Sequence, residues 1–411
     1  MPPLPETTAG PPPPPAADRA GAGPSPGPSP DQRRAMYRDM VLTRSFDVQA
    51  SALQRQGQLA LWAPCLGQEA AQVGSAHALA ADDWVFPSYR EHGVLQARGV
   101  ALADLLALFR GADNGGWDTE RHRVHLYTLV VGAQVLHAVG YGIGLMLDRA
   151  LDARAAGPAA GAVVVYLGDG ATSQGEVSEG LVWAASSNAP VLFFIQNNGW
   201  AISTPTATQA RLPLARRGEG FGIPGERVDG NDVDACFRAT AAALERIRAG
   251  QGPQIVEALT YRRGPHTTSD DPSRYRTAEQ EAAWEARDPV ALARAALEAD
   301  GLADQAFFDA ADAAGSRLAA EARQRCASLQ APPLEDCFGW AYGSEHRLVA
   351  EEAAAWRGRD SLAAAVAGSA GLAAAGAAVL AGAGAAGPAD EGGAGLAAAG
   401  AGVLAGAGAA R

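Results

Sequence analysis

The sequence contains no lysine, so all 33 of its basic side chains are arginines. This absence excludes a Schiff base between a lysine and a carbonyl substrate. The 45 acidic side chains outnumber the arginines, and the formal net charge is −12. A nucleic-acid-binding surface needs the opposite sign of charge, so we expect no nucleic-acid partner.

Cysteine is also scarce, with four residues and no CxxC pair. Such a pattern favours neither a disulfide framework nor a zinc site and is typical of a reducing compartment. The first thirty residues contain one arginine and no long apolar run, so neither a secretory signal nor an arginine-rich transit peptide is expected. The abundance of Ala, Gly, Arg and Pro is typical of a GC-rich bacterial gene. We therefore expect a bacterial cytoplasmic protein.

Composition divides the chain into three parts. Residues 1–30 are mostly Pro, Gly, Ala and Ser and should be disordered, because they have too few large apolar side chains to form a core. Residues 31–358 have the mixed composition of a folded domain, which opens with a long amphipathic helix for which Asp31 is the expected N-cap. Residues 359–411 form an Ala/Gly-rich tail with an internal near-repeat. Its low content of Leu and Val favours a flexible tail over a membrane span.

Short apolar runs alternate with helical patterns in the middle of the chain. The clearest strand candidates are residues 163–167, 191–195 and 255–261. This alternation predicts an α/β fold with a parallel sheet and helices on both faces. Residues 278–328 are rich in helix-forming residues and predict an additional helical C-terminal region.

Two of the strand candidates end in polar residues that suit a cation. The first ends at Gly168-Asp169-Gly170 and the second at Asn197-Asn198, so Asp169 and Asn198 are 29 positions apart. Carboxylate and carboxamide oxygens are ligands that Mg²⁺ accepts alongside substrate phosphates. Ligands of open α/β sheets bind at the carboxyl ends of the strands, where glycines let the backbone approach a phosphate closely.

This pattern resembles the thiamine diphosphate motif, in which GDG is followed about thirty residues later by NN. A dinucleotide-binding turn or a plain buried βαβ unit is the alternative, but the GxGxxG spacing is missing. Further similarity lies in four blocks in the same order, at 66–93, 129–140, 227–232 and 261–276. The chain resembles the alpha subunit of the thiamine diphosphate-dependent first component of 2-oxo acid dehydrogenase complexes. The resemblance implies a thiamine diphosphate-binding fold.

The resemblance also assigns the residues of a cofactor site. Asp169, Asn198 and the Trp200 carbonyl match magnesium ligands, and Tyr89 and Arg90 match contacts to the diphosphate. A guanidinium beside a phenol suits a pair of phosphate oxygens. The remaining cofactor-binding positions implied are Leu129, Val131, Gly168, Gly170, Ala171 and His266.

Three of these positions have specific expected roles. Val131 matches an apolar side chain that holds thiamine in its bent conformation, and the Leu129 carbonyl matches an acceptor for the aminopyrimidine. Gly170 and Ala171 are expected to offer backbone N–H groups to the phosphates at a helix N-terminus. His266 is the expected catalytic residue, because it matches a histidine at the diphosphate and acyl-transfer region and can carry charge near neutral pH.

One essential residue is missing from the chain. Thiamine enzymes use a glutamate that binds the aminopyrimidine ring, and relatives of this type take it from a beta subunit. The resemblance therefore implies an α2β2 heterotetramer that is active only when both subunits are present. It also implies transfer of the acyl product to a lipoylated acyltransferase core.

The substrate is expected to be a small 2-oxo acid. The GAQ, TSQG and GPHT segments favour pyruvate, 3-methyl-2-oxobutanoate and other branched-chain 2-oxo acids come next, and acetoin is third. A non-catalytic paralogue that binds thiamine diphosphate or the beta chain is the alternative of a different class. The intact GDG and NN pair and His266 favour the enzyme.

Overall fold

The computed structural model describes residues 27–113, 116–151, 161–333, 335–339 and 342–359. The chain divides into two compact units, with the boundary between Ala331 and Pro332. The expectations for residues 1–26 and 360–411 lie outside the described residues. The expected end of the folded domain at residue 358 falls within the second unit and stays a prediction.

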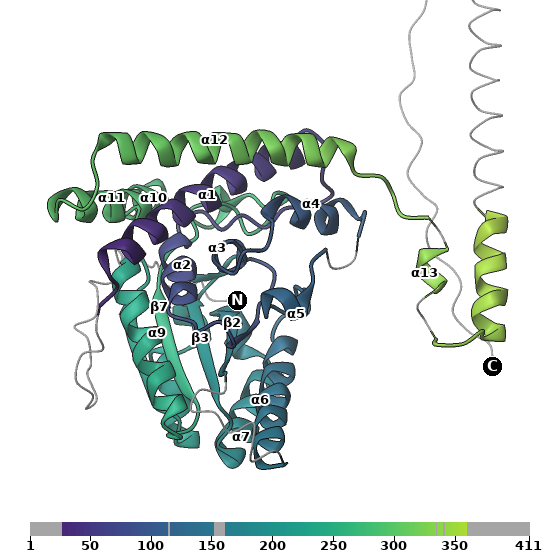
Figure 1. Ribbon diagram of the computed structural model, residues 1–411, viewed down its shortest axis with the longest axis horizontal. Coiled ribbons are helices and arrows are strands. Elements are labelled where there is room, and N and C mark those ends of the chain that lie inside the picture. Colours follow the sequence, from purple (N-terminus) through teal and green to yellow (C-terminus); the bar gives the residue numbers. More distant parts are fainter. Residues whose placement is uncertain (1–26, 114–115, 152–160, 334, 340–341, 360–411) are drawn as a thin grey trace, which may run out of the picture. The chain divides into compact units, whose positions relative to one another are not determined.

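The first unit is built on a five-stranded sheet with the order β1-β2-β3-β7-β6. Its strands are β1 (Trp84–Phe86), β2 (Val163–Gly168), β3 (Val191–Asn197), β7 (Gln254–Leu259) and β6 (Gly225–Asp229). Every neighbouring pair in this sheet is parallel. The predicted α/β fold with a parallel sheet is confirmed, and the helices lie on both faces (Figure 1).

The alternation of side chains along β2 and β3 explains why both faces are covered. Val163 and Val165 of β2 belong to the core under α6 (Ala133–Leu151) and α7 (Gly175–Ser187). Val164 points to the opposite face and packs in a second core. Successive side chains of a strand point to opposite faces, so a continuous apolar run requires a cover on each side.

The second face is covered by α2 (Glu69–His77), α9 (Val233–Arg248) and the long helix α1 (Pro30–Arg55). The cap of α1 differs from the prediction: Ser29, and not Asp31, is the N-cap. The Ser29 side chain accepts from the Gln32 backbone, and the Gln32 side chain accepts from the Ser29 backbone. This reciprocal pair satisfies two N–H groups at once, which is why it defines the start of the helix.

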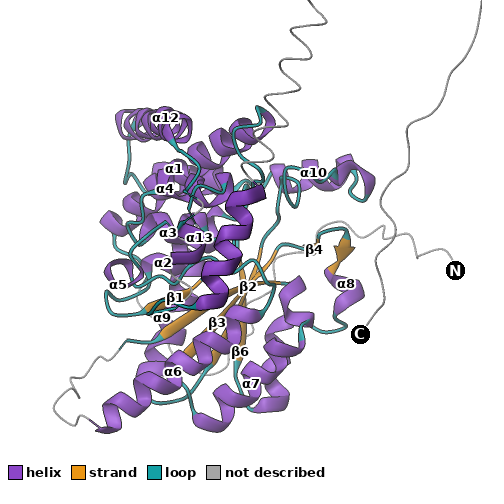
Figure 2. Ribbon diagram, turned by 90° about the vertical axis from the view of Figure 1, so that its right-hand side faces the viewer, coloured by secondary structure: helices purple, strands orange, loops and turns teal. Residues whose placement is uncertain are grey.

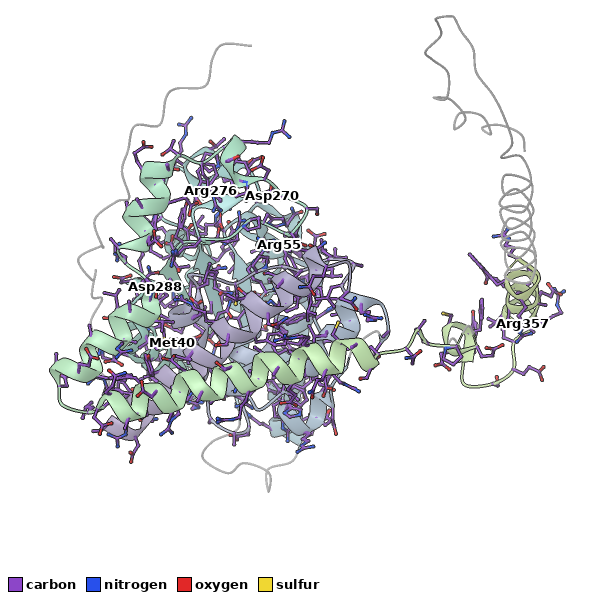
Figure 3. All side chains as sticks on the ribbon, turned by 90° about the horizontal axis from the view of Figure 1, so that it is seen from above. Met40, Arg55, Asp270, Arg276, Asp288 and Arg357 are labelled. Carbon is purple, nitrogen blue, oxygen red and sulfur yellow. The ribbon has the colours of Figure 1, made fainter. Side chains whose placement is uncertain are left out.

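Helix α12 (Gln305–Ser328) packs along α1 and closes this layer. Met40 of α1 and Phe308 of α12 belong to one buried cluster, and Figure 3 shows α12 extending past Met40. With α10 (Ala278–Glu285) and α11 (Pro289–Ala299), α12 forms the helical region predicted for residues 278–328.

Shorter elements complete the described chain. The helices are α3 (His92–Ala97), α4 (Leu102–Arg110), α5 (Thr119–His122), α8 (Thr206–Gln209) and α13 (Asp336–Gly339), the 3-10 turns are η1 (Gly170–Ser173), η2 (Leu214–Phe221) and η3 (Pro272–Arg274), and β4 (Trp200–Ala201) pairs with β5 (Thr204–Pro205). The second unit contains α13 and a helix over residues 347–359. Within the described residues, no helix combines the length and the apolar composition that crossing a membrane requires.

Candidate functional site

A cavity of about 240 Å³ opens at the carboxyl ends of β2 and β3. Figure 2 shows the hairpin strand β4 and helix α8 close to this end of the sheet. Ten of the residues predicted from the sequence line the cavity: Tyr89, Arg90, Val131, Gly168, Asp169, Gly170, Ala171, Asn198, Trp200 and His266. Four separate sequence blocks therefore meet in one place, because parallel strands bring their carboxyl ends to the same edge.

Leu129 is the predicted residue that does not line the cavity. Its side chain is 57% exposed, and Val130 beside it is 70% exposed. Val131, two positions further on, lines the cavity and is 39% exposed. The loop that carries these three residues therefore presents apolar side chains to solvent at the edge of the cavity.

Asp169 follows β2 directly, and its carboxylate is buried at the cavity wall. Its Oδ2 accepts hydrogen bonds from Thr206 Oγ1 at 2.9 Å and from Gln209 Nε2 at 3.2 Å. Burial raises the pKa of Asp169 above its usual value, and the two hydrogen bonds oppose that shift. A buried carboxylate of this kind gains from a nearby positive charge.

Asn198 follows β3 and is 7% exposed. Its Oδ1 accepts from the Trp200 backbone N–H at 3.2 Å, and its Nδ2 donates to Gln68 Oε1 at 3.2 Å. The neighbouring Asn197 is turned into the protein, where it donates to Glu257 Oε1 at 2.7 Å. The paired asparagines thus have different positions, and Asn198 is the one that lines the cavity.

The two glycines that flank Asp169 have different surroundings. A Cβ added at Gly168, the last residue of β2, would meet no atom within 4 Å, whereas one at Gly170 would lie 2.7 Å from the Ala201 Cβ. Gly170 is therefore required for packing against the β4–β5 hairpin. The expected helix start is corrected here, because Gly170–Ser173 is a 3-10 turn and α7 begins at Gly175.

Two buried arginines give this end of the sheet a positive charge. Arg90 donates to the carbonyl oxygens of Pro64 and His266, at 2.5 and 2.8 Å. Arg262 is fully buried and donates to the Gly264 and Ile202 carbonyls. Within the described chain neither forms an ion pair with a carboxylate, so an anion in the cavity would meet charge that is not already neutralised.

His266 lies against Arg90, with 3.3 Å between His266 Nδ1 and Arg90 Nη2. Burial and the charges of Arg90 and Arg262 lower the pKa of His266 to about 3. The structure therefore favours the neutral imidazole near neutral pH over the charged form that the sequence allowed, and the catalytic role of His266 stays a prediction. Its neutral form accepts at Nδ1 and can donate from Nε2.

The loop of His266 is fixed from both sides. Asp270 accepts from the His266 backbone N–H at 2.8 Å and from the Tyr275 hydroxyl at 2.5 Å. Arg276 donates to the Arg262 carbonyl at 2.6 Å. Figure 3 labels Asp270 and Arg276 at the same end of the molecule.

Several polar residues of the cavity were not predicted. The additional polar side chains that line it are those of Gln68, Ser88, Glu91, Gln134, Gln174 and Gln196. Gln68 Nε2 and Gln134 Oε1 are buried and have no hydrogen-bond partner within the described structure. Most of these residues are direct neighbours of a predicted motif in the sequence, and that adjacency is the signal that could have identified them.

The cavity therefore combines buried side-chain oxygens, one arginine without a carboxylate partner and unpaired amide groups. Asp169 and Asn198 suit a hard cation, and Arg90 suits a phosphate. Unpaired buried polar atoms are costly unless a ligand or water satisfies them. On these grounds the residues present fit a magnesium diphosphate group.

Comparison with known proteins gives a consistent result. The profile of the family described as "Dehydrogenase E1 component" matches residues 37–335. The 3-methyl-2-oxobutanoate dehydrogenase subunit alpha of Mycobacterium tuberculosis is 43% identical over 303 residues, which cover 74% of this chain and 80% of that protein. The pyruvate dehydrogenase E1 component subunit alpha of Staphylococcus epidermidis is 42% identical over 265 residues, 64% of this chain and 69% of that protein. The subunit of the same name from Acholeplasma laidlawii is 42% identical over 258 residues, 62% and 72% of the two chains.

Proposed function

Because this chain belongs to the dehydrogenase E1 component family, we propose that it is the alpha subunit of a pyruvate dehydrogenase. The reaction is the oxidative decarboxylation of pyruvate, with transfer of the acetyl group to a lipoyl group of an acyltransferase core. The observation that carries the proposal is the meeting of Asp169, Asn198 and Arg90 in one cavity. The family is thiamine diphosphate-dependent, and magnesium is the cation that this set of oxygen ligands suits.

The chain's own residues bind and orient the cofactor. Asp169 and Asn198 would hold Mg²⁺, Arg90 and Tyr89 the diphosphate, and Val131 would support the thiamine from below. When bound, thiamine diphosphate supplies the nucleophilic carbon and the electron sink for decarboxylation. His266, neutral at neutral pH, would act as a hydrogen-bond donor from Nε2 to a developing negative charge rather than as a source of positive charge.

A beta subunit completes the site in this proposal. The glutamate that activates the aminopyrimidine is expected from that partner, in an α2β2 heterotetramer. The exposed apolar loop at Leu129–Val131 beside the cavity supports an open side that a partner covers. A bacterial cytoplasmic location is part of the proposal, supported by the bacterial relatives.

A branched-chain 2-oxo acid is the second candidate substrate. It is favoured by the Mycobacterium tuberculosis relative, whose match extends over more of this chain than the matches to the two pyruvate dehydrogenase subunits described above. One or two methylene groups change selectivity by only about 1–3 kcal/mol, so small differences in the pocket decide between these substrates.

The test is co-expression of the full chain with a beta subunit that carries the missing glutamate. Reduction of an artificial dye is measured with thiamine diphosphate, Mg²⁺ and either pyruvate, 3-methyl-2-oxobutanoate or acetoin. The largest kcat/KM is expected for pyruvate. A larger kcat/KM for another compound would make that compound the assigned substrate. Cofactor binding without turnover of any substrate would identify a non-catalytic paralogue.

A further inference from the structure

Three buried polar side chains form a connected network under the cavity. Gln72 of α2, Glu91 before α3 and Gln196 of β3 are 0%, 1% and 2% exposed, respectively. Glu91 and Gln196 also line the cavity. Burying a carboxylate and two carboxamides is costly unless each is hydrogen-bonded, so their arrangement requires an explanation.

Glu91 folds back onto the residues that precede it. Its Oε2 accepts from the backbone N–H groups of Ser88 and Arg90, at 2.8 and 3.2 Å. The Ser88 hydroxyl lies 3.1 Å from the same oxygen. Tyr89 stands between these two anchored residues, so the carboxylate holds the turn from which the Tyr89 and Arg90 side chains project.

The other carboxylate oxygen connects this turn to β3. Gln196 Nε2 donates to Glu91 Oε1 at 2.7 Å. Gln196 is two positions before Asn198 in the chain, and its backbone pairs with Gly168 of β2. The link therefore crosses the end of β2 and joins the loop after β1 to the end of β3.

Gln72 closes the network from the α2 side. Its Nε2 donates to the Arg90 carbonyl at 2.9 Å and to Gln196 Oε1 at 3.0 Å. Its Oε1 accepts from the Gly93 backbone N–H at 2.9 Å. The backbone N–H and carbonyl of Arg90 are thus both bound to side chains of this network.

We propose that Glu91 is a positioning residue, which with Gln196 and Gln72 sets the distance between the Tyr89–Arg90 turn and the strand end that carries Asn198. This inference rests on the proposed function, because its consequence is the spacing between the phosphate-binding and cation-binding parts of the cavity. The network leaves the chemistry to other groups. Its role is to hold two chain segments, which are not adjacent in the sheet, in one arrangement before the cofactor binds.

The test uses Glu91→Gln in the full chain co-expressed with the beta subunit. The substitution keeps the shape but leaves one acceptor oxygen where Glu91 had two, and it directs an amide N–H₂ toward groups that are already donors. We expect the thiamine diphosphate concentration for half-saturation, at fixed Mg²⁺, to rise about tenfold, which corresponds to one charge-assisted hydrogen bond. The change in kcat should be smaller. Amide hydrogen exchange in a peptide covering residues 87–93 should be faster even without cofactor.

A matched control is Asp83→Asn. Asp83 is also a fully buried carboxylate that binds backbone N–H groups, those of Ala80 and Ala162, and it pairs in addition with Arg248, but it lies at the amino-terminal end of β2. We expect this variant to lower the melting temperature without changing half-saturation by thiamine diphosphate. If the Glu91→Gln complex also had a lower melting temperature and unchanged half-saturation by thiamine diphosphate, Glu91 would contribute only to general stability and the inference would be overturned.

A second variant keeps the inference testable if Glu91→Gln does not fold. Gln196→Met removes the donor to Glu91 and the acceptor for Gln72 at similar volume, and the same rise in half-saturation, of smaller size, is expected. Where both variants fold, the double variant should bind the cofactor no more weakly than Glu91→Gln alone, since both changes act on one network. If the variants had the same amide hydrogen exchange and the same half-saturation by thiamine diphosphate as the wild type, the inference would be overturned and the proposed function would be unaffected. A wild-type complex that binds no thiamine diphosphate would overturn the proposed function as well.

Discussion

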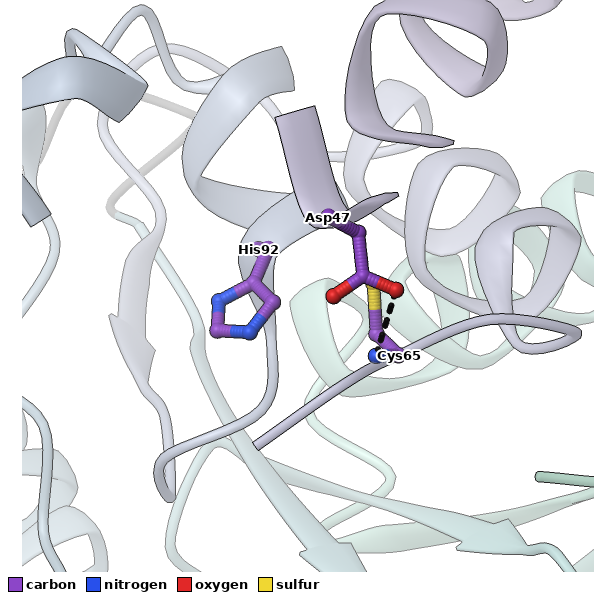
Figure 4. Close-up of side chains that lie close together, drawn as sticks. All are labelled: Asp47, Cys65 and His92. Carbon is purple, nitrogen blue, oxygen red and sulfur yellow. Dashed lines mark hydrogen bonds between the residues drawn. The ribbon is translucent and has the colours of Figure 1, made fainter. Parts of the chain in front are cut away.

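Two buried groups of metal-binding residue types lie near each other in this fold, and they differ in what their atoms contact. Asp47, Cys65 and His92 form a compact cluster in which their potential ligand atoms lie within 4.8 Å of one another (Figure 4). The cavity places Asp169 and Asn198 at two strand ends. By residue type alone, the cluster is the more convincing metal site, since Cys, His and carboxylate are common transition-metal ligands.

The contacts reverse that ranking. Asp47 accepts from Trp62 Nε1 at 2.7 Å and from the Cys65 backbone N–H at 3.1 Å. His92 Nε2 lies 2.9 Å from the Ala63 carbonyl oxygen and its Nδ1 2.7 Å from the Tyr127 hydroxyl. A carbonyl can only accept, so Nε2 carries the proton and Nδ1 accepts from Tyr127. Both ring nitrogens are therefore engaged within the protein.

Burial raises the pKa of Cys65 well above its usual value, so the thiol of the cluster carries its proton in the absence of a metal ion. The cavity, by contrast, contains buried amide atoms without partners, at Gln68 and Gln134. The ligand-type atoms of both groups have hydrogen-bond partners within the protein, and the difference is that unpaired amide atoms lie beside those of the cavity.

The largest expected effect that tests this contrast is the loss of cofactor binding in Asp169→Ala. The variant removes the one carboxylate among the proposed cation ligands, and we expect the affinity of the αβ complex for thiamine diphosphate and Mg²⁺ to fall by about a hundredfold. Isothermal titration calorimetry measures this change directly. An unchanged affinity would remove Asp169 from the cation site and with it the basis of the proposed function.

The next effect concerns the stability of the cluster. Asp47→Ala leaves the buried Trp62 N–H and Cys65 N–H without an acceptor, which should lower the free energy of unfolding by about 2–4 kcal/mol. Urea denaturation of the wild-type and variant complexes provides the measurement. A chelator such as EDTA should leave the wild-type unfolding midpoint unchanged when no cofactor is added. Stoichiometric zinc with a lower midpoint after chelation would show that the cluster is a metal site.

The pH dependence of Asp47 separates the cluster from the cavity further. Burial raises the pKa of Asp47 to about 7 from 3.8, so the folded state binds this proton more tightly than the unfolded state. The stabilisation is fully present below pH 3.8 and is lost as the pH rises through about 7. Compared with Asp47→Asn, which does not titrate, the wild type should lose roughly 2–4 kcal/mol of relative stability across this window. Unfolding curves from pH 4 to 8 test it, and a flat difference would contradict the buried acid.

His266 in the cavity should show the opposite slope. Its pKa is lowered from 6.5 to about 3, so the unfolded state takes up the proton first as the pH falls. The stability of the wild type relative to His266→Gln should therefore be constant above pH 6.5 and decrease below it. The same unfolding series measures this difference. If the relative stability of the wild type instead decreased as the pH rose above 6.5, the histidine would be charged in the folded state.

The smallest expected effect comes from the unpaired amide of Gln134. Gln134→Met keeps the volume but removes Oε1, which has no partner, together with Nε2, which donates to the Tyr166 carbonyl at 2.9 Å. We expect cofactor affinity to fall about threefold, within the range of one neutral hydrogen bond, and thermal stability to change little. Titration with thiamine diphosphate and differential scanning calorimetry provide the two readouts. A large loss of stability with normal affinity would make Gln134 a structural residue.

Local patterns in the sequence predicted the sheet and much of the cavity. The apolar runs at β2 and β3 and the polar residues that end them are contiguous, so Asp169 and Asn198 could be placed at strand ends in advance. The N-cap of α1 was misplaced, because Ser29 and Asp31 are both good caps and the reciprocal bond with Gln32 decides between them.

The charge of His266 and the role of Glu91 could not be predicted from local patterns. The pKa of His266 depends on Arg90 and Arg262, which reach it only through the tertiary fold. Glu91 reads as an ordinary surface glutamate until Gln196, from a strand 105 positions away, is placed beside it. Such properties arise from contacts distant in sequence, for which a single chain has no local signal.

The two asparagines at the end of β3 have a wider consequence. Asn197 is the last residue of β3 and is committed to the scaffold, whereas Asn198 follows the strand and lines the cavity, so a slip of the strand by one position would exchange them. The apolar residues of β3, from Val191 to Ile195, hold that register. Substitutions among these residues could therefore abolish coenzyme binding without contacting the coenzyme. A binding defect caused by a substitution in this strand should be attributed first to a shift of strand register and only then to a loss of stability.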